Sequence, residues 1–253
     1  MIILSMDGYL LVDKPRGLTS HDVVARVRRI LRTAHSTQPI ADSQNQLNTK
    51  SYELRARAPK PKVGHTGTLD PLASGLMILV LGSYTKRAQE FSKMDKTYEA
   101  VITLGATSAT GDGEGPIIAI SNKQIAKSEV EKALKSFVGE IMQTPHAHSA
   151  VKVGGQRAYK LARAGKDFKI EPRKVTIYEL QSTNYGYPKL CITARVSSGT
   201  YIRSLAEDIG QKLGTGAYVS ALRRTKVGQF DIKEAQGLEN LNISKLQTGV
   251  VKE

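Results

Sequence analysis

The stretch from residue 63 to residue 81 limits the folds open to this sequence more than any other part of it. Its first part, Val63–Gly75, is a loop with three glycines and one carboxylate, Asp70, which stands directly before Pro71. Glycine permits positive φ and a close approach by a ligand, and proline disfavours the α region for the residue before it. The six residues Leu76–Leu81 that follow are all apolar and predict a buried strand or a buried helical turn. We therefore expect a carboxylate on a shaped loop beside a rigid, buried element.

Two interpretations of Asp70 follow from these residue types. An aspartate in a loop rich in glycine and proline often caps its own backbone in a turn. The same aspartate, exposed on a loop that a rigid element supports, is a candidate functional group. The residue types alone leave both interpretations open.

The charge balance favours a polyanionic partner. The chain has 253 residues, with 37 Lys and Arg against 23 Asp and Glu, and a formal net charge of +14. Such an excess is typical of proteins that bind nucleic acid or an acidic membrane surface. A chain of this length can bury a sizeable core in one large domain or two small ones.

The cysteine content and the first residues indicate the compartment. The single cysteine, Cys191, excludes an internal disulfide and a cysteine-rich metal site, which favours an intracellular location. The start lacks a basic segment, and Asp7 interrupts its apolar residues, so no signal peptide is expected. No stretch approaches the roughly 18 apolar residues that a membrane helix needs. We expect a soluble, cytoplasmic protein with no membrane partner.

Strands and helices are mixed without a regular βαβ repeat, which favours an α+β fold over a doubly wound one. Residues 33–62 show no hydrophobic period and are expected to form a polar insertion, which either contacts RNA or is an inert surface loop. Thr19 or Ser20 can cap the first helix. Strands are predicted over 8–15, 96–104, 174–181 and 189–197, and helices from about 20, over 85–94, 128–138 and 204–213, with an amphipathic segment over 217–224.

Four further segments carry a family resemblance together with the Gly64-His65-Thr66-Gly67-x-Leu69-Asp70-Pro71 loop. They are Lys14-Pro15-x-Gly17-x-Thr19-Ser20, Lys96-x-Tyr98, the stretch Ser149–Gly165, and Gly199–Arg203 with Leu222–Arg224. In this order they resemble the motifs of the bacterial tRNA pseudouridine-55 synthases of the TruB type. The matches span most of residues 9–228, and chance agreement of five ordered motifs is negligible.

The resemblance implies a fold and a reaction. The fold would be a central mixed, mostly antiparallel sheet flanked by helices, the pseudouridine synthase fold, with a basic thumb loop. The reaction would be the isomerisation of uridine to pseudouridine in the T-loop of tRNA, by base flipping and an aspartate nucleophile. Neither a metal nor a cofactor is expected. A glycal pathway and a pathway through an adduct at the base both stay open.

The resemblance also assigns three catalytic residues. Asp70 would be the nucleophile, and a carboxylate can serve this role because breaking a glycosidic bond leaves positive charge at the sugar. Arg203 would pair with Asp70, since a nearby guanidinium favours the ionised carboxylate. Tyr98 would stack on the target base and take part in a proton transfer. We therefore expect an Asp70–Arg203 ion pair.

Five more residues are expected to bind RNA by the same resemblance. His65 would enter the T-loop and stack where the flipped base had been, and Leu222 would pack around that base. Asp112 would hold either the flipped nucleotide or an arginine. Lys152 and Arg157 belong to a basic flap, rich in glycine, that would grip the RNA.

The expected domain organisation is a catalytic domain over residues 1–235 and a short tail over 236–253. The catalytic domain would contain the insertion at 33–62 and the RNA-gripping thumb at 145–173. The tail is too short for the RNA-binding PUA domain that many relatives carry. We expect a monomer that binds the T-arm stem-loop of tRNA without a guide RNA.

Two positions depart from the family pattern. His148, within Pro145–Ala150, stands where an aromatic ring is usual, and it could still stack with some sensitivity to pH. Ala109 stands where relatives often carry an acid.

Three other functions deserve comparison with the leading one. A dyskerin-like, guide-RNA-dependent pseudouridine synthase would lean on the C-terminal domain and protein partners that are not expected here. A non-catalytic module that binds or folds RNA would not need Asp70, Tyr98 and Arg203 together. A basic structural protein of the ribosome would explain the charge but none of the motifs.

Overall fold

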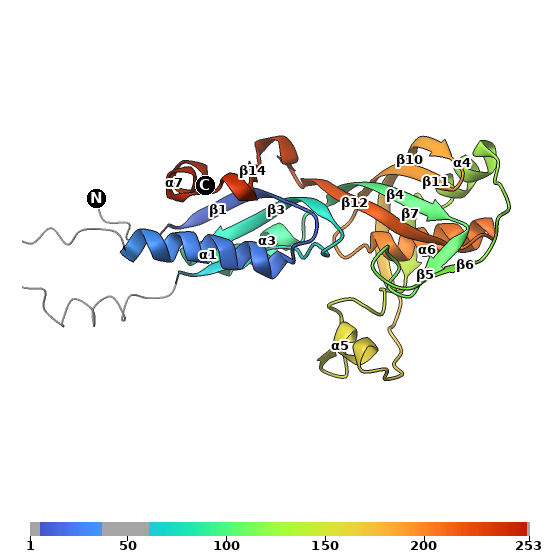
Figure 1. Cartoon of the computed structure of the whole chain (residues 1–253), viewed down its shortest axis with the longest axis horizontal. Coiled ribbons are helices and arrows are strands. Elements are labelled where there is room, and N and C mark those ends of the chain that lie inside the picture. Colours follow the sequence, from blue (N-terminus) through green and yellow to red (C-terminus); the bar gives the residue numbers. More distant parts are fainter. Residues whose placement is uncertain (1–5, 37–60, 252–253) are drawn as a thin grey trace, which may run out of the picture. The chain divides into compact units, whose positions relative to one another are not determined.

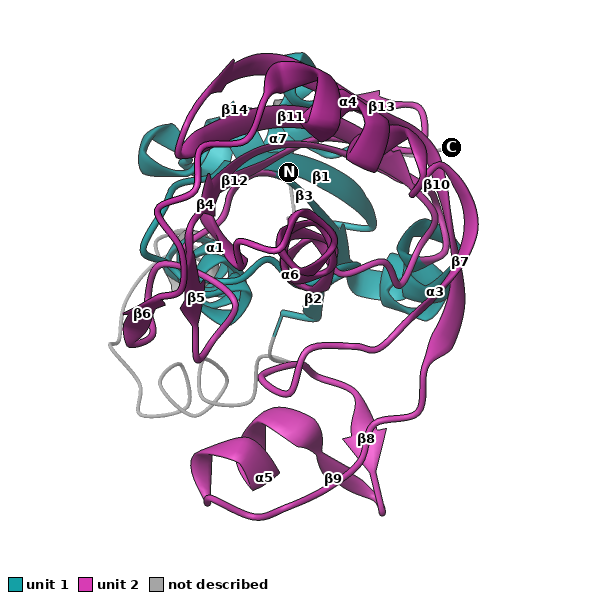
Figure 2. Cartoon of the chain, turned by 90° about the vertical axis from the view of Figure 1, so that its right-hand side faces the viewer, with its two compact units in different colours: residues 1–71, 76–92, 232–253 teal, residues 72–75, 93–231 magenta. Residues whose placement is uncertain are grey.

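The computed structural model describes residues 6–36 and 61–251, which fall into two compact units. Unit 1 comprises residues 1–71, 76–92 and 232–253, and unit 2 comprises residues 72–75 and 93–231 (Figure 2). The predicted insertion begins inside helix α1 (Ser20–Ser36), and its residues 37–60 lie outside the described residues. Every helix in the described part of the chain is too short or too polar to cross a membrane.

Unit 1 is built on the neighbouring strands β1 and β3 (Figure 1). β14 pairs in parallel with β1, β2 pairs antiparallel with β3, and α1 packs against β2 and α7. The remaining bounds in unit 1 are β1 (Gly8–Lys14), β2 (Val63–His65), β3 (Ser74–Leu81), η1 (Gly82–Arg87), α3 (Ala88–Ser92), η2 (Ile232–Glu234), β14 (Gln236–Gly237), η3 (Leu238–Asn240) and α7 (Ile243–Gly249).

The apolar run after the Asp70 loop is a strand. Each residue from Leu76 to Leu81 is at most 1% exposed. A strand that is buried on both faces needs a continuous apolar sequence rather than an alternating one. Of the two structures that the run predicted, the buried strand is therefore the one formed.

Thr19 caps helix α1. Its hydroxyl accepts from the backbone N–H of Asp22 at 3.1 Å, and the Asp22 carboxylate accepts from the backbone N–H of Thr19 at 2.8 Å. This reciprocal pair is a capping box, in which two backbone donors of the first turn find acceptors. The Ser20 hydroxyl is therefore not needed as the helix cap and makes other contacts.

Unit 2 is a strongly curved sheet in the order β12-β4-β11-β10-β7, with antiparallel neighbours throughout. Figure 2 shows its strands curving around helix α6, which packs against β12 and α4. The bounds in unit 2 are β4 (Lys96–Leu104), β5 (Ala106–Ser108), β6 (Ile117–Ala119), α4 (Lys127–Lys135), β7 (Gly139–Gln143), β8 (Lys152–Val153), β9 (Gln156–Arg157), α5 (Ala158–Arg163), β10 (Arg173–Gly186), β11 (Lys189–Val196), α6 (Ile202–Leu213), β12 (Ala217–Val227) and β13 (Phe230–Asp231).

The amphipathic segment predicted over residues 217–224 is the start of strand β12. Ala217 and Val219 are buried, whereas Tyr218 and Ser220 between them are partly exposed, which is the period of two that a strand requires. At its other end β12 pairs in parallel with Ser74, which opens β3 and belongs to unit 2. The sheet is thus mixed and mostly antiparallel with flanking helices, and the expected fold class is confirmed.

The predicted thumb forms the hairpin β8–β9 and helix α5, which extend away from the sheet of unit 2 (Figure 1). Its base is fixed to the residues just before it. The backbone N–H groups of Ala158 and Tyr159 donate to the carbonyls of Val151 at 2.7 Å and Ser149 at 3.0 Å. The Arg157 guanidinium donates to the carbonyl of Ala150.

Gly210 allows α6 to lie close to β12. A Cβ built at this position would overlap the backbone of Gly216 and Ala217. A larger residue would therefore push the helix away from the strand. The helix ends shortly afterwards at Gly214, whose φ of 68° suits glycine in the left-handed conformation.

We expect Gly210→Ala to lower the free energy of unfolding by about 1–3 kcal/mol, because it overpacks the contact between α6 and β12. At an ordinary helical glycine the same change stabilises by about 0.5–1 kcal/mol, so the sign of the effect is diagnostic. Denaturant unfolding of both proteins measures it. Gln211→Ala, at the exposed neighbouring position, is the control and should stay within about 0.5 kcal/mol. A stabilising Gly210→Ala would contradict the close packing.

Candidate active site

The Asp70 loop is held by residues of the Lys14–Ser20 motif, all within unit 1. The Ser20 hydroxyl accepts from the backbone N–H of Leu69 at 2.8 Å and donates to the carbonyl of Leu69 at 3.0 Å. The backbone N–H of Gly17 donates to the carbonyl of Pro71 at 2.8 Å. The residues on both sides of Asp70 are therefore fixed, and Asp70 itself is half-buried between them.

The supporting role of Ser20 and Gly17 was missed from the sequence. Both residues lie in a motif that the sequence does reveal, but the residue types there indicate Ser20 only as a candidate helix cap. The motif is braced internally by Lys14, whose buried ammonium donates to the carbonyls of Pro15 at 3.0 Å and Leu18 at 2.7 Å. Nothing local in the sequence indicates that a hydroxyl at position 20 meets position 69.

His65 ends strand β2 in the same unit. Its ring meets the ring of His21 edge to face, with centroids 5.4 Å apart and planes at 82°. The next residue, Thr66, donates through both its backbone N–H and its hydroxyl to the carbonyl of Ile78, at 3.1 and 3.2 Å. The chain from His65 to Asp70 is thus anchored at both ends.

Tyr98 and Leu222 lie on one face of the sheet in unit 2. Tyr98 is opposite Arg224 across the β4–β12 pair, and Ala100 is opposite Leu222. Residues opposite one another, or two apart on one strand, share a face, so Tyr98 and Leu222 are diagonal neighbours. Tyr98 is 9% exposed and Leu222 is half-buried.

Two cations share this face with Tyr98. Arg224 is 2% exposed, and Lys96, two residues before Tyr98, is 8% exposed and donates to the carbonyl of Met94. Burial, and then the nearby Arg224 charge, lower the pKa of Lys96 to about 8. Tyr98 thus shares its sheet face with two buried cationic side chains.

Arg203, in the first turn of α6, is buried and fixed by three acceptors. Its guanidinium donates to the carbonyl of Thr110 at 2.9 Å and to the carbonyl of His148 at 3.1 Å, and it lies 3.5 Å from a carboxylate oxygen of Asp112. Asp112 also accepts from the Thr110 hydroxyl at 2.6 Å and from the backbone N–H of Glu114 at 3.1 Å. One of the two roles expected for Asp112 is to hold an arginine, and its carboxylate lies beside Arg203; the role in holding the flipped nucleotide stays a prediction.

His148, the departure from the family pattern, lies beside Arg203 in unit 2. Its half-buried ring stacks with that of His146, with centroids 5.7 Å apart and planes at 28°. Burial lowers the pKa of His148, and the nearby His146 and Arg203 lower it further. The change of charge of the ring therefore falls at lower pH than that of an ordinary histidine. Ala109, the other departure, is exposed.

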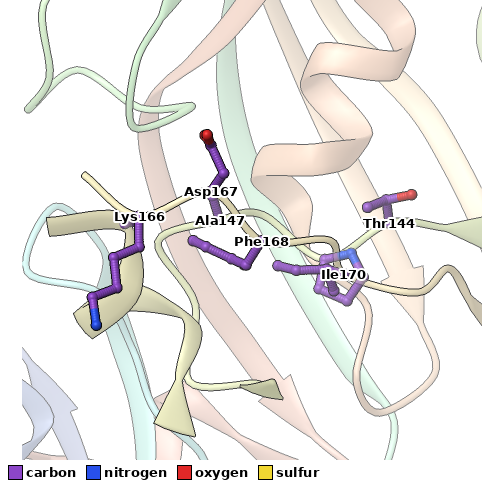
Figure 3. A pocket seen from close by; sticks show the side chains of 8 residues that line it. Thr144, Ala147, Lys166, Asp167, Phe168 and Ile170 are labelled. Carbon is purple, nitrogen blue, oxygen red and sulfur yellow. The ribbon is translucent and has the colours of Figure 1, made fainter. Parts of the chain in front are cut away.

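The thumb presents Lys152 and Arg157 opposite one another on the exposed hairpin β8–β9. At its base is a pocket of about 400 Å³, lined by Thr144, Pro145, Ala147, Ala162, Lys166, Asp167, Phe168 and Ile170 (Figure 3). Phe168 and Ile170 lie in its middle, and Lys166 and Asp167 point away from them. None of the predicted site residues is among those that line this pocket.

The predicted site residues fall into both units. His65 and Asp70 belong to unit 1, whereas Tyr98, Asp112, Arg203 and Leu222 belong to unit 2. The expected Asp70–Arg203 ion pair would join the units and stays a prediction. Within the described ranges, no group of three or more His, Cys, Asp or Glu side chains is arranged to hold a metal ion.

Ser20→Ala removes the hydroxyl that both accepts from and donates to the Leu69 backbone. Leaving a buried backbone group unpaired costs about 1–3 kcal/mol, so we expect the free energy of unfolding to fall by that amount. Denaturant unfolding measures the loss. The control is Ser128→Ala, at an exposed position, which should change stability by less than about 0.5 kcal/mol. Equal stabilities for the two variants would show that the hydroxyl does not hold the loop.

The raised pKa of Asp208 predicts that the stability of the fold depends on pH. Burial, and then the adjacent Glu207, raise its pKa from 3.8 to about 6. Its contribution to stability is thus fully present below pH 4 and is lost as the pH rises through about 6, because the fold disfavours the ionised form. The stability of Asp208→Asn relative to wild type should therefore increase between pH 4 and pH 7.

The control for Asp208 is Glu131→Gln, at an exposed position on α4, for which no such trend is expected. Thermal or denaturant unfolding across this pH range measures both variants. A difference between Asp208→Asn and wild type that does not change with pH would contradict the raised pKa.

Comparisons with known proteins agree over nearly the whole chain. A family model described as "TruB family pseudouridylate synthase (N terminal domain)" matches residues 53–202, and one described as "tRNA pseudouridylate synthase B C-terminal domain" matches residues 203–248. Proteins named tRNA pseudouridine synthase B from Aquifex aeolicus (strain VF5) and Azoarcus sp. (strain BH72) are each 41% identical. These matches cover 92% and 94% of this chain and 73% and 71% of the relatives.

Solved structures are similar as well. A chain in a crystal structure of a Cbf5-Nop10-Gar1 complex is 28% identical with a TM-score of 0.65, and the match covers 92% of this chain and 53% of that one. A chain in the structure of an H/ACA RNP bound to a substrate RNA containing 2'-deoxyuridine is 26% identical with a TM-score of 0.61, over 92% and 52%. This chain thus spans about half the length of those two. Together with the family models and the curated relatives, these findings show that the chain belongs to the TruB family of tRNA pseudouridine synthases, which are isomerases.

Proposed function

We propose that this enzyme isomerises uridine to pseudouridine in the T-loop of tRNA, with Asp70 as the nucleophile. The observation that carries the proposal is the fixed backbone around Asp70, in which Leu69 is bonded twice to Ser20 and Pro71 once to Gly17. A nucleophile gains from such fixation because a misplaced attacking group loses much of its rate advantage. An aspartate that only capped its own turn would not need these distant anchors.

The reaction needs one carboxylate and a way to keep it ionised. The bond between the sugar and the uracil nitrogen breaks, the base turns, and a new bond forms to a ring carbon. That carbon loses its proton and the released nitrogen gains one, so the product is an isomer of the substrate. When the base leaves, positive charge develops at the sugar. The Asp70 carboxylate either stabilises this charge or attacks as a nucleophile. Arg203 pairs with Asp70 and favours its ionised form. Its own burial, with Asp112 as an acid partner, gives it a fixed place from which to do so.

The flipped base enters between Tyr98 and Leu222. Taking a base out of its stack costs a few kcal/mol, and stacking on an aromatic ring returns about 1–3 kcal/mol. The shared sheet face of Tyr98 and Leu222 supports this role, because one side chain supplies the ring and the other an apolar wall. Tyr98 also takes part in proton transfer at the sugar or the base.

The RNA is gripped by the basic thumb and by His65. Lys152 and Arg157 contact phosphates, and His65 enters the T-loop where the flipped base had been. With a net charge of +14, the protein's affinity for tRNA falls steeply as salt is raised, because binding releases counterions. The enzyme acts as a cytoplasmic monomer on the T-arm.

The enzyme works without a guide RNA. The chains from the Cbf5-Nop10-Gar1 and H/ACA RNP structures are 28% and 26% identical to this one, whereas the synthases named for tRNA are 41% identical. The closer similarity supports direct recognition of tRNA. A T-arm stem-loop alone is then a sufficient substrate.

We expect wild-type protein to form pseudouridine at the T-loop uridine of an unmodified T-arm stem-loop, without guide RNA and with a metal chelator present. Asp70→Asn should bind the same RNA and form none, because the amide is a far weaker nucleophile than the carboxylate. Asp95→Asn, which changes a carboxylate that accepts from the exposed Tyr178, is the matched control and should retain activity.

Nuclease digestion with mass spectrometry locates the pseudouridine, and a filter assay measures binding. Activity in Asp70→Asn would remove Asp70 from the nucleophile's role. RNA binding by wild type without any pseudouridine, even on full-length tRNA, would favour a non-catalytic RNA-binding module instead.

A further inference from the structure

The acceptors that hold Arg203 come from two separate segments of unit 2. Thr110 and Asp112 belong to the loop after β5, and His148 belongs to the turn between β7 and the thumb. Neither segment is a helix or a named strand at these residues.

The loop is tied to β12 by an isolated bridge between Asp112 and Val219, in which the Val219 N–H donates to the carbonyl of Gly111 at 3.0 Å, whereas the turn at His148 pairs with no strand in the described part of the chain. The position of the guanidinium therefore depends in part on the contacts that hold the turn to α6 and to the loop. One of these is the bond from the Ser204 hydroxyl to the carbonyl of Thr144 at 2.9 Å.

His146 joins the turn to α6. Its Nδ1 accepts from the backbone N–H of His148 at 3.1 Å, and its Nε2 lies 3.2 Å from a carboxylate oxygen of Glu207, one helical turn after Arg203. An acceptor at Nδ1 together with a proton at Nε2 is the neutral imidazole in one defined tautomer. The ring therefore fixes the backbone of the residue whose carbonyl meets Arg203.

The loop after β5 packs against both His146 and Glu207. A Cβ built at Gly111, which lies between the two residues that hold Arg203, would come within 2.9 Å of the Glu207 carboxylate and of two atoms of the His146 ring. Its φ of +69° also suits glycine. The His146–Glu207 pair thus contacts α6, the turn and the loop, with the His146 side chain only 8% exposed.

We propose that His146 and Glu207 are positioning residues that fix the Arg203 guanidinium by holding together the two segments that supply its acceptors. This inference rests on the proposed function, in which Arg203 pairs with the nucleophile.

The inference predicts a loss of rate rather than of RNA affinity. In His146→Ala and Glu207→Ala, Arg203 is free to shift, and a shift of about 1 Å in a reacting group lowers the rate constant roughly 10- to 100-fold. The Kd for the RNA should stay within about twofold, since neither residue contacts RNA in this proposal. Glu207→Gln should lose less than about threefold, because its amide oxygen still accepts from the neutral Nε2–H of His146.

The experiment measures single-turnover pseudouridine formation and Kd on a T-arm stem-loop, with Tm for each variant. Gln211→Ala, exposed on the same helix, is the control and should match wild type. His148→Ala removes the stacking ring but keeps the carbonyl that meets Arg203, so its loss of rate should be smaller than that of His146→Ala. If an alanine variant fails to fold, His146→Asn replaces it, since its amide oxygen supplies an acceptor near His148 but the side chain is too short to reach Glu207.

Unchanged rate constants in the His146 and Glu207 variants would overturn the inference, and so would a lowered Tm with an unchanged rate constant. A loss in His148→Ala as large as in His146→Ala would assign the effect to the His148 ring and overturn it too. In all these outcomes wild type makes pseudouridine, and the proposed function stands. A wild type that makes none would overturn the proposed function and this inference with it.

Discussion

The buried guanidinium of Arg203 imposes the strictest requirement on unit 2. A charged group removed from water needs compensating charge and hydrogen bonds, and partial compensation is strongly destabilising. Asp112 supplies the charge, and the carbonyls of Thr110 and His148 supply hydrogen bonds. The start of α6 is fixed as well, because the Gln143 side chain bonds both the N–H and the carbonyl of Tyr201. The curved sheet thus brings two irregular segments and the end of β7 to the first turn of α6.

In unit 1 the buried groups that need partners are backbone groups rather than a charged side chain. The segment around Asp70 has no ladder of its own, yet the N–H and carbonyl of Leu69 are buried and need partners. A single hydroxyl, that of Ser20, provides both. Because Ser20 opens α1, whose first turn is closed by the Thr19–Asp22 capping box, the carboxylate loop inherits the rigidity of that helix.

The features of the fold and the site that could be predicted from the sequence are those that local patterns of residues determine. The burial of the apolar run 76–81, the strand 96–104 and the helix near 204–213 follow from local sequence patterns, but the choice of a strand over a helical turn for the run 76–81 does not. The motifs identified the family, which the comparisons confirmed. Contacts between distant residues could not be predicted, such as that of Ser20 with Leu69 or of His146 with Glu207. β12 was recognised only as amphipathic because its bulges against β4 interrupt the alternation. Asp112 was the exception, since one of its two expected partners was an arginine.

The short stretch between His148 and the thumb has a mechanical consequence. The thumb hairpin begins at Lys152, and its base is bonded back to the carbonyls of Ser149, Ala150 and Val151. The carbonyl that meets Arg203 therefore precedes a braced segment that leads directly into the hairpin β8–β9, which grips the RNA in the proposed function. A thumb that swings on its substrate must either bend within these few residues or transmit torque to the guanidinium. The hold on the RNA and the position of Arg203 would then be coupled through one of the two connections of the thumb, the other being the return of the chain to β10 at Arg173.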